Sequence, residues 1–196
     1  MSRIARRVVA VAFVGTLVGL ALSQAHAGPI VDSSLKLWLD ASDLTTIHTS
    51  GGFIDTWDDK SGNSNNATAA GTARPTTANG FFGQPTVRFD GTNDGMSTPL
   101  SITTPDYTVF AVFDYNSSTS AMRRAIQGTN NWLIGPYANG LRNYAVTNWV
   151  TNPGPAVTQG QFYITDSTNN GTASAFRVNG VDYTTGATNV GVPGTI

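Results

Sequence analysis

The strongest candidates for metal chemistry in this 196-residue chain are three clusters of aspartate and asparagine. Ca²⁺ prefers hard oxygen ligands, which these side chains supply when they lie on loops. None of the clusters has the ligand spacing of an EF-hand. Such side chains also cap turns by accepting hydrogen bonds from nearby backbone amides. We therefore expect either a calcium site or a set of capped turns among Asp40 and Asp43; Asp58, Asp59, Asn63 and Asn65; and Asp90, Asn93 and Asp94.

Aromatic residues beside asparagines recur in the second half of the chain, and this mixture is typical of sugar binding. An exposed aromatic face stacks on a sugar ring, and neighbouring polar groups bond to its hydroxyls. The mixture occurs at Asn130-Asn131-Trp132, Tyr137, Asn143-Tyr144 and Asn148-Trp149. We expect ligand contacts from Trp149, Tyr144, Asn148 and Trp132, with Trp149 first because it precedes the polar loop Thr151–Pro155. The alternative for each ring is a place in the core.

The chain offers little for catalysis. Glycosidases use a close pair of carboxylates, generally glutamates on one strand in enzymes with a β-sandwich fold. Here all twelve acidic residues are aspartates, and no Asp-x-Asp pair falls on a predicted strand. There is no cysteine and no Gly-x-Ser-x-Gly motif, and His48 is the only histidine after residue 27. An Asp-based enzyme is therefore the weakest alternative.

Residue usage predicts an all-β fold. Glutamate is absent and lysine occurs only twice, whereas threonine, asparagine and glycine are frequent. Many short strands joined by turn-forming residues favour a sandwich or jelly roll. The predicted strands are Leu35–Asp40, Gly52–Trp57, Pro85–Asp90, Tyr107–Tyr115, Met122–Gln127, Trp132–Gly135, Leu141–Thr147, Gln161–Thr165, Ala173–Asn179 and Val181–Thr184.

Two of these strand predictions are more specific. Tyr107–Tyr115 is apolar at nearly every position, which indicates a central strand buried on both faces. Asn179-Gly180 between two alternating segments predicts a hairpin with a type I′ turn.

The first 27 residues have the pattern of a signal peptide. Three arginines precede the apolar run Val8–Leu22, and Ala25-His26-Ala27 is a small-x-small cleavage site. We expect cleavage after Ala27, a secreted or cell-surface location, and no membrane span in residues 28–196. We expect residues 28–196 to form a single domain. They contain eight basic and twelve acidic residues, a net charge of −4, which argues against nucleic acid as a partner.

Three short motifs resemble a known family. In Leu37–Asp43, Trp57–Asn63 and Val87–Gly91, a short apolar strand runs into aspartate and then a small residue. Their order and spacing resemble the opening of laminin-G-like, concanavalin-A-like jelly-roll domains of bacterial secreted proteins. The resemblance covers most of residues 28–196. It implies an antiparallel β-sandwich with Trp38, Trp57 and Phe89 in the core and a calcium ion at a loop rim.

The resemblance also implies that the C-terminal strands are missing. Similar domains continue past the Asn-Gly hairpin, and their last strands pair with their first. We therefore expect a truncated domain in which Leu35–Asp40 is an unpaired edge strand.

These features together predict an exported, non-catalytic recognition or adhesion module that binds an extracellular glycan or protein, with calcium assisting. Two alternatives stay open. The first is a structural surface or matrix module without a ligand pocket, and the second is a carbohydrate-active enzyme with an Asp-based site. Exposed aromatic residues on the concave sheet face favour the lectin function, and a flat polar concave face favours the structural one. Two aspartate carboxylates about 5–10 Å apart in a cleft favour the enzyme.

Overall fold

The computed structural model describes residues 33–116, 123–138, 140–151, 154–186 and 191–196. The predicted signal peptide lies outside these residues. The described chain is all-β, as predicted, with antiparallel strands and only three short 3₁₀ turns at Leu44–Thr46, Gly71–Ala73 and Phe81–Gly83. Within the described residues, no helix has the length and apolar character needed to cross a membrane.

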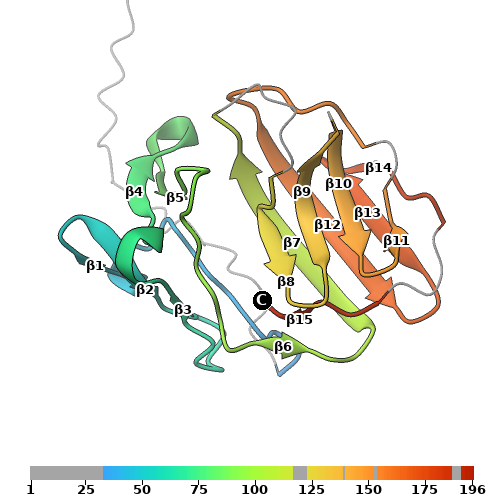
Figure 1. The fold of residues 1–196 in the computed structure, drawn as a ribbon, viewed down its shortest axis with the longest axis horizontal. Coiled ribbons are helices and arrows are strands. Elements are labelled where there is room, and N and C mark those ends of the chain that lie inside the picture. The colour runs from blue at the N-terminus through green and yellow to red at the C-terminus, as the bar shows by residue number, and fades with distance from the viewer. Residues whose placement is uncertain (1–32, 117–122, 139, 152–153, 187–190) are drawn as a thin grey trace, which may run out of the picture. The chain divides into compact units, whose positions relative to one another are not determined.

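Two four-stranded antiparallel sheets enclose the core (Figure 1). One has the order β11-β10-β9-β8 and consists of β8 (Ile126–Gly128), β9 (Trp132–Tyr137), β10 (Gly140–Ala145) and β11 (Asn148–Trp149). The other has the order β14-β13-β12-β7 and consists of β7 (Asp106–Asp114), β12 (Phe162–Asn170), β13 (Ser174–Val178) and β14 (Val181–Asp182).

The buried side chains between these sheets come from both of them. Trp132, Ile134 and Leu141 contribute from the first sheet, and Tyr163 and Phe176 contribute from the second. All five are at most 2% exposed. Burying large side chains such as these is the main favourable term in folding. The arrangement agrees with the predicted antiparallel β-sandwich.

The prediction that Tyr107–Tyr115 is buried on both faces is wrong. Exposed and partly buried residues alternate along β7, and Phe110 and Val112 are 73% and 71% exposed. β7 pairs with β12 over its whole length and ends the strand order of its sheet. Only the face towards the core is covered, so the apolar residues on the other face remain in contact with solvent.

The Asn179-Gly180 hairpin is confirmed. Both turn residues have positive φ, 50° and 79°, as a type I′ turn requires. The flanking residues Val178 and Val181 pair across the hairpin.

Residues 33–98 form smaller sheets. These contain β1 (Ile47–Ser50), β2 (Phe53–Trp57) and β3 (Ala67–Thr68), and the pair β4 (Thr76–Asn79) and β5 (Pro85–Arg88). β2 and β5 match predicted strands, whereas the polar sequence around β1 predicts a loop. Two further short strands, β6 (Ser101–Ile102) and β15 (Gly194–Thr195), pair with each other.

Two expectations about the first half of the chain are wrong. Leu35–Asp40 is not a strand, because side chains of the loop at Asp59–Asn65, instead of a neighbouring strand, bond to its backbone. Phe89 is 45% exposed and not in the core, because β5 ends at Arg88 and the chain then leaves the sheet. Trp38 and Trp57 are partly buried, outside the main core cluster.

Candidate functional site

Three aromatic rings meet on the outer face of the β8–β11 sheet. Tyr137 lies at the end of β9, Tyr144 on β10 and Trp149 on β11. The ring centroid of Trp149 is 4.7 Å from that of Tyr137 and 4.8 Å from that of Tyr144. All three residues are partly exposed. A ligand can therefore reach rings that are already packed against one another.

The register of β10 directs these residues outwards. Its alternate residues Leu141, Asn143 and Ala145 are fully buried on the core side. Since successive side chains of a strand point to opposite faces, Arg142 and Tyr144 lie on the outer face. Tyr144 pairs directly with Trp149, which brings the two rings together.

Arg142 completes this group. Its guanidinium carbon lies 5.3 Å from the ring centroid of Trp149 and 5.8 Å from that of Tyr137. These are cation–π distances. Within the described chain the side chain of Arg142 makes no ion pair, and its buried Nε has no acceptor. We call Tyr137, Arg142, Tyr144 and Trp149 the aromatic–arginine cluster.

The predicted ligand residues divide between this cluster and the core. Trp149 and Tyr144 belong to the cluster, and Asn148 is an exposed neighbour on β11. Trp132 is a correction, because it is 0% exposed and its Nε1 donates to the hydroxyl of Tyr107 at 2.9 Å. Sequence reasoning missed Arg142, although its spacing of two from Tyr144 in a predicted strand places both on one face.

The first predicted metal cluster surrounds a lysine. Nζ of Lys60 lies 2.9 Å from a carboxylate oxygen of Asp40 and 2.9 Å from one of Asp43. Burial opposes ionisation of Asp40, but hydrogen bonds from Ser42 and Lys60 outweigh it and lower its pKa. Hydrogen bonds from Thr45 and then Lys60 lower the pKa of Asp43. A lysine ammonium thus occupies the place between the carboxylates that a metal would need.

Asp59 in the second cluster bonds entirely to the protein. Its Oδ1 accepts the N–H groups of Trp38 and Ser61, both at 2.9 Å. Its Oδ2 accepts the hydroxyl of Ser61 at 2.8 Å and the N–H of Asn65 at 2.9 Å. Burial raises the pKa of Asp59, but these hydrogen bonds exceed that effect and hold it below its ordinary value.

The other members of the second cluster have separate partners. Oδ2 of Asp58 lies 2.6 Å from Nε2 of His48, and Oδ1 accepts Nδ2 of Asn66 at 2.9 Å. The side-chain amide of Asn63 donates to the carbonyl of Leu35 at 2.8 Å. These contacts fasten the loop to its surroundings.

The third cluster is a capped turn. Oδ1 of Asp90 accepts the backbone N–H groups of Thr92, Asn93 and Asp94 at 2.7, 3.1 and 3.3 Å. Oδ2 of Asp94 in turn accepts the N–H of Asp90 at 2.8 Å. The amide of Asn93 donates to the carbonyl of Thr72 at 2.5 Å.

All three clusters therefore match the capped-turn alternative. In the described part of the chain, no group of three acidic or histidine side chains is arranged to hold a metal ion. Hydrogen bonds from protein donors to the carboxylates of Asp40, Asp43, Asp58, Asp59, Asp90 and Asp94 hold these turns together. Calcium binding stays a prediction from the sequence.

The carboxylate hydrogen bonds predict a loss of stability in acid. Five described aspartates have pKa values below the ordinary value of 3.8, namely Asp40, Asp43, Asp59, Asp90 and Asp182. The unfolded chain binds more protons than the folded one just below this value, so stability falls as the pH falls through 3.8. The urea midpoint is expected to be flat above about pH 5 and to fall below pH 4. A midpoint unchanged by acid contradicts this prediction.

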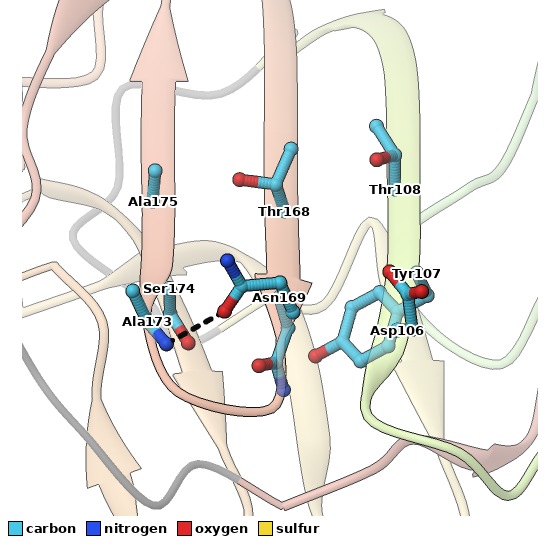
Figure 2. A pocket seen from close by; sticks show the side chains of 9 residues that line it. Asp106, Tyr107, Thr108, Thr168, Asn169, Ala173, Ser174 and Ala175 are labelled. Atoms are coloured by element: carbon cyan, nitrogen blue, oxygen red, sulfur yellow. Dashed lines mark hydrogen bonds between the residues drawn. The ribbon is translucent and has the colours of Figure 1, made fainter.

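The described chain also has a polar hollow of about 290 Å³ at one end of β7, β12 and β13 (Figure 2). Asp106, Tyr107, Asn169 and Ser174 are among its lining residues. At this end of the strands the N–H of Ala173 donates to Oδ1 of Asn170 at 2.8 Å. No residue that the sequence predicted for a site lines this hollow.

Comparison of the chain with protein-family models, with curated proteins and with solved structures gives no match. The fold and the surface alone therefore define its class, an all-β protein of antiparallel sheets with a surface cluster of aromatic residues and arginine.

Proposed function

We propose that this chain is an exported, non-catalytic recognition module that binds a glycan through the aromatic–arginine cluster. The observation that carries the proposal is the contact of three partly exposed rings on the outer face of one sheet, with centroid distances of 4.7 and 4.8 Å. The apolar C–H face of a sugar ring stacks on such rings, and the polar groups beside them provide specificity. Export rests on the signal-peptide pattern of residues 1–27.

The strands give this platform a fixed shape. Tyr144 and Trp149 are directly paired residues of β10 and β11, and the ring of Tyr137 also packs against the indole, with centroids 4.7 Å apart. A site built on strands is held more rigidly than one on loops, so little side-chain freedom is lost when a ligand binds. The resemblance to laminin-G-like jelly-roll domains also supports a binding function.

The test begins with a screen of immobilised glycans, followed by titration calorimetry on the best ligand. Trp149→Ala is expected to weaken binding by at least about tenfold, because it removes the ring shared by both contacts. Tyr144→Ala is expected to weaken it less. The control is Phe110→Ala, which removes a more exposed aromatic ring from the outer face of the other sheet.

This test can contradict the proposed function, and it can also examine the role of calcium. Equal binding by the wild type and Trp149→Ala would contradict the proposed function. Titrations in millimolar calcium and in EDTA examine the separate expectation of calcium assistance, since only an assisted site loses affinity in EDTA.

The structural alternative is supported by a different surface. Phe110, Val112 and Ile164 are 73%, 71% and 48% exposed, and the last two are paired neighbours on β7 and β12. Exposed apolar neighbours of this kind often mark a contact with another protein. Absence of glycan binding together with self-association that Phe110→Ala abolishes would favour this alternative.

A further inference from the structure

Arg142 differs from the arginines and the lysine that form ion pairs in the described chain. Lys60, Arg74 and Arg177 each contact an aspartate, at 2.9, 2.7 and 3.0 Å. Arg142 has no such partner, and its Nε is buried without an acceptor. A guanidinium without an anionic partner in the protein can pair with an acidic group of a ligand.

The sequence segment that contains the cluster has only basic charges. All twelve aspartates lie outside residues 115–165, and the only charged residues inside that range are Arg123, Arg124 and Arg142. The rest of residues 33–196 has eleven acidic and five basic residues. Arg124 bonds to neutral groups, with Nη2 3.1 Å from Oδ1 of Asn131. Residues 115–165 thus carry a charge of +3 in a chain that is otherwise acidic, and such a segment attracts anions.

The cluster also fixes the direction of the guanidinium. Arg142 lies over the rings of both Trp149 and Tyr137, which limits its rotation. Its partner across the strands is Gly135, where any side chain would overlap the backbone carbonyl of Arg123. A planar guanidinium held in this way can donate two parallel hydrogen bonds to one acidic group.

We infer that the ligand of the aromatic–arginine cluster is an acidic saccharide, whose carboxylate or sulfate group binds Arg142 while its ring stacks on Trp149. This inference rests on the proposed function, because it names the chemical class of the glycan. A neutral glycan would use the rings but would leave the charge of Arg142 without an anionic partner.

The probe is a tetramer of galacturonic acid, compared with the same tetramer after reduction of its carboxylates to alcohols. Titration calorimetry is expected to give at least tenfold tighter binding of the acidic form by the full chain. Arg142→Gln is expected to abolish this preference. Arg142→Lys keeps the charge but not the paired donors, so only part of the preference is expected to remain.

The matched control is Arg177→Gln, which removes the same charge from β13, where Arg177 pairs with Asp166. It is expected to preserve both affinities. A second comparison, of dextran sulfate with dextran, distinguishes a sulfate from a carboxylate as the preferred acidic group.

The outcomes separate this inference from the proposed function. Equal affinity for the charged and the neutral form of both probe pairs, lost in Trp149→Ala, would overturn the inference and leave the proposed function standing. A preference for the acidic probes that survives in Arg142→Gln would also overturn it. If neither form of either pair binds and the glycan screen is also negative, both proposals fail.

Discussion

Replacing Trp132 with alanine is expected to lower the free energy of unfolding by about 3–5 kcal/mol, the usual cost of removing a large core aromatic. Trp132 is fully buried between the two four-stranded sheets. Its ring packs edge-on against Tyr107 with centroids 6.1 Å apart, and its Nε1 donates to the Tyr107 hydroxyl. The substitution therefore leaves a cavity and removes one hydrogen bond of the Tyr107 hydroxyl. Urea denaturation followed by fluorescence measures the change.

The matched control is Trp149→Ala, which removes the same side chain from the outer face. Its effect on stability is expected to be below about 1 kcal/mol, since substitutions away from the core are usually mild. Trp132→Phe should fall between the two, because it keeps most of the buried volume but loses the hydrogen bond. Similar losses in both alanine variants would show that Trp149 has a structural role as well.

Replacing Asp59 with alanine is expected to destabilise the protein by about 3 kcal/mol, because hydrogen bonds to a charged acceptor contribute about 1.5–3 kcal/mol each and are not additive. The carboxylate accepts four hydrogen bonds, from Trp38, Ser61 and Asn65. One of them holds the segment Leu35–Asp40, which has no strand neighbour. The amide of Trp38 should therefore exchange its hydrogen much faster in the variant, which hydrogen-exchange mass spectrometry can measure.

Asp114→Ala is the control for the loss of an aspartate charge. Asp114 lies exposed at the end of β7 and makes no side-chain hydrogen bond or ion pair with the described chain. Its replacement is expected to change stability by less than about 0.5 kcal/mol. An Asp59→Ala variant as stable as this control would mean that water replaces the four hydrogen bonds.

Local chemistry made several elements predictable. The Asn179-Gly180 turn follows from the ease with which both residues adopt positive φ. β7 was recognised as a strand, but its exposure was not. Its sequence is apolar on both faces, and only the arrangement of the sheets decides which face has a neighbour. Leu35–Asp40 has the pattern of a strand, but its partner is a set of side chains about 20–30 residues away, which no local pattern reports.

For a similar reason, the sequence predicted only part of the candidate site. Trp132 and Trp149 both follow an asparagine, so their local sequences look alike. Both tryptophans pair with residues of β10, but on opposite faces. Trp132 pairs with Ala145 on the core side, whereas Trp149 pairs with the preceding residue, Tyr144, on the outer side. A shift of one residue in strand register exchanges the two faces. Register depends on the whole sheet and is not visible in a short motif.

The close packing of the three rings has an optical consequence. Indole and phenol rings at centroid distances of 4.7 and 4.8 Å lie near enough for their electronic transitions to couple. Their tilts of 52° and 58° make the coupled transitions chiral, which gives rise to an exciton couplet in circular dichroism. The spectrum of an all-β chain leaves that signal visible, because no strong helical bands cover it. A ligand that stacks on Trp149 would change the couplet, so the cluster reports its own occupancy without any added label.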